Sequence, residues 1–304
     1  MRQVKKAAVL TVVIIVLIAI ISGCSQGNTT EPAFEIPVPT APGISVESNE
    51  MAMIDYSNIQ DGYVIVKFIG VSDKRLKVVV EAPHNAQYVY ALSNEGIVDV
   101  IPLTEGNGEY KISVYENIDG DEFSLVLSSS VNVVLKGEFE PFLRPNQFVN
   151  YSKDSHLVEL AAELTKDADN AKEKIIAIYD FVVENFTYDY ELAANVQSGY
   201  LPNLDEVLQR KVGICFDYSA LVTAMLRSQG IPARLEIGYH GDEYHAWISL
   251  FCENNGWIDK KYYYDRSEEE WMAMDPTLES AVEELHLSRQ QARDDVNYRL
   301  MYNY

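Results

Sequence analysis

Three side chains that could together perform nucleophilic catalysis occur in order in the second half of the chain. Cys215 lies in Val-Gly-Ile-Cys-Phe-Asp-Tyr (212–218), His245 in Tyr-His-Ala-Trp (244–247), and Asp275 in Met-Asp-Pro-Thr (274–277). A thiol becomes a strong nucleophile when a nearby base takes its proton and a third group orients that base. The three residue types therefore predict an activated sulfur, with His245 as the base and Asp275 as the group that orients it.

The residues after Cys215 predict a helix over 216–229. Gly230 and Pro232 mark its end, because Gly favours a helix C-terminus and Pro cannot continue a helix. Cys215 would then lie at or before the first turn, where free N–H groups and the positive end of the helix dipole favour a thiolate. The alternative is a small buried apolar residue, the common fate of a free cysteine. The apolar face of this helix consists of Leu221, Val222, Met225 and Leu226.

Two strands are predicted after this helix, over 234–239 and 244–251, and His245 lies in the second. Asp275 ends a short strand predicted over 271–275, which the following Pro stops. There its carboxylate could accept a hydrogen bond from the His245 ring and fix its tautomer. Taken alone, Asp-Pro-Thr suggests only a turn. The residues that share a strand face with His245 are Trp247, Ser249 and Phe251.

No metal site and no cofactor are expected. His240, Glu243 and His245 fall in a loop and a strand rather than on one helix face. The three Cys residues include no Cys-x-x-Cys pair, which the usual zinc sites need. A disulfide between Cys215 and Cys252 would remove the nucleophile and competes with the catalytic hypothesis. Cys252 ends a predicted strand, and we interpret it as a free thiol.

The preceding region predicts an all-β domain over residues 51–136. Short runs of alternating apolar residues are separated by Gly- and Asp-containing turns, a pattern typical of an antiparallel β-sandwich. The acidic residues Asp119, Asp121 and Glu122 lack the rest of a calcium-binding loop and indicate a hairpin turn. Residues 24–50 are rich in Pro, Thr, Ser, Gly and Glu and predict a flexible tether.

Residues 137–304 mix helical and strand patterns and predict an α+β domain. Asn170, followed three residues later by Glu173, resembles a capping box that opens a helix. A shorter helix is predicted to begin near Ser155.

Five blocks of this region resemble the transglutaminase-like superfamily, the papain-like enzymes with a Cys, His, Asp triad. The resemblance covers about residues 154–277 and, more loosely, the Tyr-rich end at 298–304. It implies a core of helices packed on an antiparallel sheet, with Cys215 as nucleophile, His245 as base and Asp275 as orienting acid. The blocks that carry it are 213–221, 225–234, 244–247, 256–258 and 274–277.

The same resemblance implies acyl transfer through a thioester. The thiolate attacks an amide carbon, His245 protonates the departing amine, and water or a second amine resolves the thioester. Candidate oxyanion donors are the Cys215 N–H, Gln209 and Tyr200. A Tyr- and Glu-rich insert precedes the Asp-Pro-Thr block and leaves Asp259 as the alternative orienting acid. Hydrolysis and amine transfer both remain open.

The first 23 residues have the features of an export signal. A basic start precedes an apolar run over 7–21, which is too short for a bilayer-spanning helix and suits a signal core. Ile-Ser-Gly-Cys at 21–24 resembles the bacterial lipobox, which implies cleavage before Cys24 and lipid attachment to its sulfur. The mature chain would be anchored on the extracytoplasmic face of the cell membrane. An uncleaved anchor helix or an ordinary signal peptide is the alternative.

The chain is strongly acidic. Its net charge of −22 becomes −25 without the signal, which holds three basic and no acidic residues. Repulsion from phosphate backbones excludes nucleic acid as an expected partner, and repulsion from anionic lipid favours attachment through acyl chains. We expect an enzyme that acts on protein or peptide amides, with cell-wall components as further partners. The alternatives are the same fold with an idle triad, binding peptides or cell-wall fragments, and a structural adhesin led by the β domain.

Overall fold

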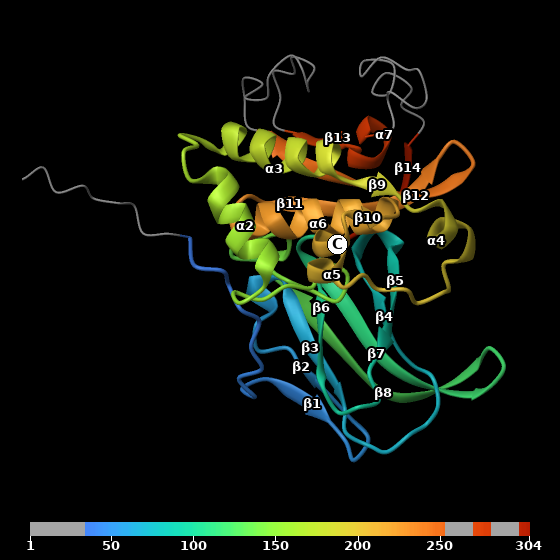
Figure 1. The fold of residues 1–304 in the computed structure, drawn as a ribbon. Coiled ribbons are helices and arrows are strands. Elements are labelled where there is room, and N and C mark those ends of the chain that lie inside the picture. The colour runs from blue at the N-terminus through green and yellow to red at the C-terminus, as the bar shows by residue number, and fades with distance from the viewer. Residues whose placement is uncertain (1–33, 253–269, 281–297) are drawn as a thin grey trace, which may run out of the picture. The chain divides into compact units, whose positions relative to one another are not determined.

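The computed structural model describes residues 34–252, 270–280 and 298–304. The predicted signal, Cys24 and Asp259 lie outside these residues. From Glu35 to Tyr304 the chain forms one compact unit. Its N-terminal half consists mainly of strands, and its C-terminal half combines helices with strands, as the α+β class requires (Figure 1). No helix in the described ranges has both the length and the hydropathy needed to cross a bilayer.

The β-rich part contains two four-stranded sheets, and every neighbouring pair in them is antiparallel. The residues expected to alternate, such as Val64, Val66, Ile112 and Val114, are buried. The first sheet has the order β1 (Val46–Ser48), β2 (Ala52–Asp55), β3 (Tyr63–Phe68), β6 (Val98–Pro102). The second has the order β5 (Gln87–Leu92), β4 (Leu76–Glu81), β7 (Gly108–Asp119), β8 (Glu122–Val133). Single turns of 3₁₀ helix are η1 (Ile59–Asp61), η2 (Pro83–Asn85) and η3 (Glu140–Phe142).

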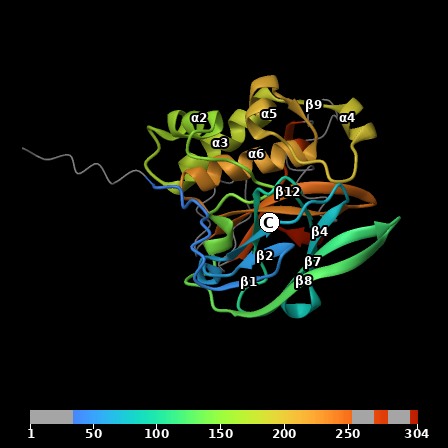
Figure 2. The same cartoon turned by 90° about the horizontal axis from the view of Figure 1, so that it is seen from below.

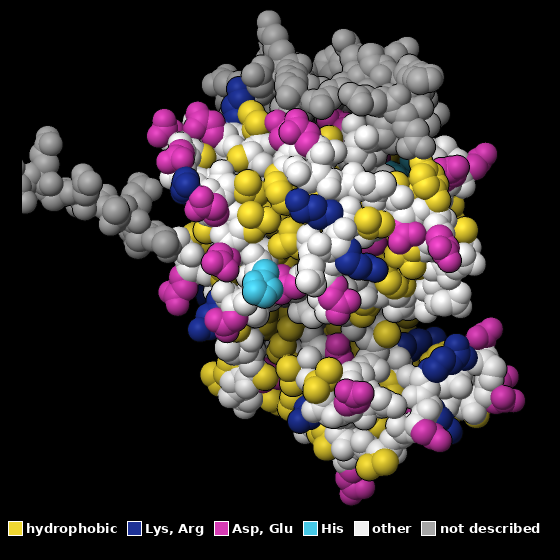
Figure 3. All heavy atoms as spheres, in the orientation of Figure 1, with side chains coloured by type: hydrophobic (Ala, Val, Ile, Leu, Met, Phe, Trp, Pro, Cys, Tyr) yellow, Lys and Arg dark blue, Asp and Glu magenta, His cyan; other side chains and the backbone are white. Residues whose placement is uncertain are grey.

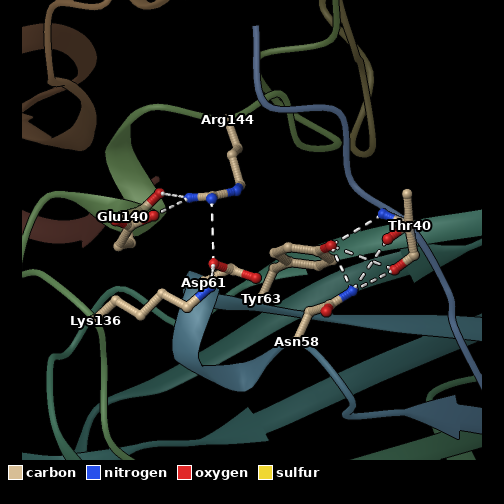
Figure 4. A network of polar contacts seen from close by, with 7 residues as sticks. All are labelled: Thr40, Asn58, Asp61, Tyr63, Lys136, Glu140 and Arg144. Carbon is tan, nitrogen blue, oxygen red and sulfur yellow. Dashed lines mark hydrogen bonds and ion pairs between the residues drawn. The ribbon is translucent and has the colours of Figure 1, made fainter. Parts of the chain in front are cut away.

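The end of the segment expected to be a flexible tether is fixed to the β-rich part. Thr40 N donates to Tyr63 Oη at 2.9 Å, and Asn58 Nδ2 donates to Thr40 O at 2.8 Å (Figure 4). Gly43 N donates to Asp55 Oδ2 at 2.8 Å, and β1 follows directly. The expectation of flexibility up to residue 50 is therefore corrected. Side-chain partners from β2, from β3 and from Asn58, the residue before η1, satisfy the backbone here. Apolar periodicity does not reveal such partners.

A charged network fixes the connection from the β-rich part to the first helix. Arg144 donates to Glu140 at 2.6 Å and lies 3.4 Å from Asp61, which Lys136 also contacts at 2.8 Å (Figure 4). Gly62 fits beside this connection because it has no side chain: a Cβ there would lie 2.6 Å from Pro141 Cγ. The connection is therefore held against η1.

The helical part consists of six helices, a four-stranded antiparallel sheet and a short parallel pair, counted over the described residues. The helices are α2 (His156–Thr165), α3 (Ala171–Asn185), α4 (Tyr190–Asn195), α5 (Leu204–Arg210), α6 (Cys215–Ser228) and α7 (Pro276–Ser280). The sheet order is β13 (Glu270–Met274), β12 (Glu243–Cys252), β11 (Ala233–His240), β14 (Tyr298–Asn303). The parallel pair is β9 (Thr187–Tyr188) with β10 (Val212–Gly213).

Helix α6 is the centre of this part. Every residue from Asp217 to Ser228 is buried, as expected for a helix covered on all sides. The helix lies beside α2 and α3 and packs on β12 (Figures 1 and 2). The Arg227 guanidinium, fully buried, donates to Ala233 O at 3.0 and 2.8 Å and to Arg144 O at 2.7 Å. Burial lowers the pKa of Arg227 to about 10, and these bonds fix the end of α6.

The pairing of β11 with β14 requires a glycine. The register shifts between Ile237 and Gly238, where β14 approaches closely. A Cβ on Gly238 would lie 2.1 Å from the Arg299 carbonyl oxygen, and backbone cannot retreat as a flexible side chain can. Gly238 therefore allows β14 to pair at this position.

We expect Gly238→Ala to destabilise the fold by about 3 kcal/mol, the upper range for overpacking, because β14 must shift away from β11. Denaturant unfolding measures this change. Gly137→Ala is the matched control, since the atom nearest its added Cβ is 3.8 Å away. Equal stabilities of the two variants would contradict the close approach of β14.

Candidate active site

Cys215 is the first residue of α6, one position earlier than the helix expected from sequence. It is a free cysteine and partly buried, so the competing disulfide with Cys252 is absent here. Asp217 holds the turn that precedes it, since Asp217 Oδ2 accepts from Ile214 N at 2.8 Å. Asp217 is fully buried, and this burial raises its pKa. A Cβ on Gly213 would lie 2.7 Å from the Asp217 side chain, so a glycine is needed at that position.

His245 lies on β12 beside the start of α6. Ser219, one turn after Cys215, donates through Oγ to Ala246 O at 3.1 Å, and both residues are buried. This bond joins the helix of the thiol to the strand of the imidazole. The Trp247 ring stacks on the His245 ring with centroids 6.4 Å apart, and Trp247 Nε1 donates to Glu236 at 2.6 Å. The Trp247 ring therefore restricts movement of the imidazole on one side.

Asp275 precedes α7 and acts as its N-cap. Its Oδ1 accepts from the N–H groups of Thr277 at 3.0 Å and Leu278 at 2.9 Å. Pro at the first helical position fits, because that residue needs no N–H partner. The Asp-Pro-Thr block is thus a helix start rather than a simple turn.

The other Asp275 oxygen faces the imidazole. His245 Nε2 lies 2.6 Å from Asp275 Oδ2, and the His245 side chain also hydrogen-bonds Cys215. Because Nε2 is directed to the carboxylate, Nδ1 is the nitrogen left for the sulfur. Cys215, His245 and Asp275 thus come together in the order that the sequence predicts.

The charges of this group support one another. Burial alone would lower the pKa of His245, but its hydrogen bonds to Asp275 and Cys215 outweigh that effect and raise it to about 10. Burial would raise the pKa of Asp275, yet the hydrogen bonds from His245, Leu278 and Tyr298 bring it below its usual value. At neutral pH the ring is therefore positive and the carboxylate negative. A positive ring beside a sulfur favours the thiolate.

The two side-chain oxyanion candidates are placed differently from expectation. The Tyr200 hydroxyl donates to Asp217 Oδ1 at 2.7 Å, so its proton serves the turn before α6. Gln209 is exposed on α5, and no hydrogen bond of the described residues joins its side chain to Cys215 or His245. The Cys215 N–H remains as a donor, because the first amides of a helix have no carbonyl partner within it.

Tyr298 is a contact that sequence reasoning missed. Its hydroxyl donates to Asp275 Oδ2 at 2.8 Å from β14. The only signal was the Tyr-rich character of 298–304, which does not say which ring points inward. Within the described residues, no group of three or more His, Cys, Asp or Glu side chains is placed to hold a metal ion.

The raised pKa of His245 predicts a loss of stability in alkali. Its contribution is complete below the ordinary value of 6.5 and disappears as the pH passes about 10. Between these values, the unfolding free energy of the wild type should fall relative to that of His245→Gln. Denaturant titrations at several pH values measure it. His156→Gln, an exposed site on α2, should keep the wild-type dependence; parallel curves for all three proteins would contradict the pairing.

The profile of the transglutaminase-like superfamily matches residues 158–261, a range that includes Cys215 and His245. The uncharacterized protein YebA of Bacillus subtilis is 32% identical over a match that covers 33% of this chain and 16% of that protein. The protein-glutamine gamma-glutamyltransferase of Pseudomonas aeruginosa is 29% identical, covering 29% of this chain and 13% of that protein. The chain thus spans about a sixth or less of the length of these curated relatives.

Among solved structures, a protein of Cytophaga hutchinsonii with a provisional assignment as a cysteine protease is similar with a TM-score of 0.37. It is 16% identical, and the match covers 77% of this chain and 69% of that one. On the match of the family profile over residues 158–261, this chain contains a domain of the transglutaminase-like superfamily.

Proposed function

We propose that the chain is a cysteine acyl-transfer enzyme that acts on protein or peptide amides through a thioester. The observation that carries the proposal is the chain of contacts from Cys215 through His245 to Asp275, with a hydrogen bond at each step. A merely structural cysteine has no need of a protonated imidazole held by a buried carboxylate. Such an arrangement matches an activated thiol nucleophile.

The reaction would proceed in two halves. The Cys215 thiolate attacks the amide carbon, and the negative charge on the carbonyl oxygen lies near the Cys215 N–H at the start of α6. As the C–N bond breaks, the His245 imidazolium gives its proton to the departing amine, and the acyl group stays on sulfur as a thioester. A water or a primary amine then gives a proton to neutral His245 and attacks the thioester carbon. The C–S bond breaks, Cys215 leaves as the thiolate, and the proton stays on His245, which restores the thiolate–imidazolium pair.

Asp275 keeps the imidazole oriented through both halves. Because its Oδ1 is held by two α7 amides, the carboxylate has one orientation toward His245. The name of the Pseudomonas relative, a protein-glutamine gamma-glutamyltransferase, supports resolution by an amine as one outcome. Resolution by water would make the same site a protease or amidase.

The location is proposed from sequence alone. The lipobox-like residues before Cys24 support a lipid-anchored protein on the extracytoplasmic face of the cell membrane, within reach of cell-wall components. Figure 3 shows Asp and Glu side chains spread over the face drawn, on both the strand part and the helical part. This surface supports attachment through acyl chains, since anionic lipid would repel it.

The catalytic proposal predicts products that depend on Cys215. The full chain in detergent is incubated with a peptide library, with and without a primary amine, and product masses are recorded. Cleavage, deamidation or amine incorporation should each fall by at least about 1,000-fold in Cys215→Ala. Cys252→Ala is the matched control and should keep activity. If no peptide reacts and iodoacetamide labels Cys215 no faster than Cys252 at low pH, the idle binding module is the correct alternative.

The lipid proposal predicts fatty-acid labelling at Cys24. Cells fed an alkyne-bearing fatty acid should label the wild type and lose the label in Cys24→Ala, because no sulfur remains to accept lipid. Mass spectrometry of the N-terminal peptide checks the cleavage point. An unlabelled wild type with an N-terminus after position 24 would show an ordinary signal peptide instead.

A further inference from the structure

A tyrosine from a strand outside the three catalytic segments contacts the carboxylate of the triad. Tyr298 Oη donates to Asp275 Oδ2 at 2.8 Å, and this is the oxygen that His245 Nε2 approaches at 2.6 Å. We propose that Tyr298 is a positioning residue, which sets the reactivity of Cys215 through Asp275 without touching substrate. Its relevance to turnover rests on the proposed function, but its effect on the thiol does not.

The hydrogen bonds to Asp275 show what Tyr298 supplies. A carboxylate has about four lone-pair directions. Two on Oδ1 are filled by Thr277 N and Leu278 N, and two on Oδ2 by His245 and Tyr298. The α7 amides come with the helix cap, and His245 takes part in the reaction. Tyr298 is thus the donor that fixes the oxygen that faces His245, and without it that oxygen keeps its contact with His245.

The position of Tyr298 is fixed independently of α7. Its ring packs against Trp247 and His240, with centroids 4.8 Å apart in both cases. The close pairing of β14 with β11 at Gly238 fixes the register of β14, and with it the position of Tyr298 along the sheet. A hydroxyl held by a different element can restrain the carboxylate even when the short helix α7 moves.

The far end of β14 is anchored in the β-rich part. Asn303 Nδ2 donates to Glu105 Oε1 at 3.2 Å, and the rings of Tyr302 and Tyr304 lie 5.6 and 5.7 Å from that of Tyr88. Tyr88 Oη also donates to Glu105. The strand that presents Tyr298 is therefore held at both ends, which is what a positioning role requires.

The charges around Asp275 give the direction of the effect. The His245 imidazolium faces Asp275 from β12, and Cys215 on α6 hydrogen-bonds that ring. His240 on β11 packs against the Tyr298 ring, and Glu279 on α7 adds a negative charge near Tyr298. Loss of the Tyr298 hydroxyl removes a donor that stabilises the carboxylate. Asp275 should then take a proton at higher pH, and the imidazolium would lose its partner there.

The test measures alkylation of Cys215 by iodoacetamide, resolved by mass spectrometry, in the full chain in detergent across acid to neutral pH. In Tyr298→Phe we expect the alkylation rate to be roughly tenfold lower at acid pH. The acid limb, the pH range over which this rate rises, should move up by about one pH unit, the effect of losing one hydrogen bond to a charged group. Tyr302→Phe, the same change on the same strand, should leave both unchanged.

A second background separates positioning from simple support of the fold. In Asp275→Asn, the further change Tyr298→Phe should no longer move the limb, because the group through which it acts is gone. An unshifted limb in Tyr298→Phe, or an equal shift in the Asp275→Asn background, overturns the proposal. A lower unfolding midpoint with an unshifted limb also overturns it, since that is a structural role. Normal alkylation without turnover on any peptide would count against the proposed function alone.

Discussion

The hydrogen bond between His245 and Asp275 is the interaction on which the arrangement of the site depends. Both side chains are largely buried, with exposed fractions of 15% and 7%, and an unpaired charge in such a place is costly. The fold offsets that cost from several elements. Helix α7 supplies two amides, β14 supplies a hydroxyl and β12 supplies the imidazole. With these hydrogen bonds, His245 can stay protonated beside the Cys215 sulfur.

The sulfur itself depends on a different kind of support. Helix α6 is buried along nearly its whole length, and its close packing restricts movement of the helix. Cys215, its first residue, is therefore held in place. Ser219 fixes the helix to β12 next to His245, and Arg227 fixes its far end to β11. Cys215 and His245 therefore lie on two rigid elements rather than on loops, which favours a constant distance between them.

The meeting of Cys215, His245 and Asp275 could be predicted from sequence, because each residue lies in a local pattern that also predicts its element. Cys215 precedes a clear helical period, and Asp275 precedes a proline. The roles of Asp217 and Tyr200 could not, since a hydrogen bond across seventeen positions depends on how the segment between α4 and α5 lies against α6. Tyr200 was a candidate donor to the oxyanion, and its hydroxyl instead donates to Asp217, which holds the turn before α6. Propensity and periodicity describe one element at a time, whereas this contact needs two.

The same limit explains the N-terminal segment. Its Pro and Ser content predicts an extended chain, and extended it is, but Asp55, Ser57 and Tyr63 provide partners for its backbone. The β-rich pattern, in contrast, was readable because alternation alone decides which residues face a core. Patterns that arise from burial are visible in one sequence, and polar partnerships between distant segments are not.

The place of β14 in the chain has a consequence for biosynthesis. The ribosome releases the thiol and the imidazole well before Tyr298, and β14 must pair with β11 across a long stretch of sequence. Non-local pairing of this kind comes late in folding. A nascent chain therefore carries its potentially reactive sulfur for some time without the last donor to Asp275. The set of hydrogen bonds to Asp275 is therefore complete only after β14 has been synthesised and has paired with β11.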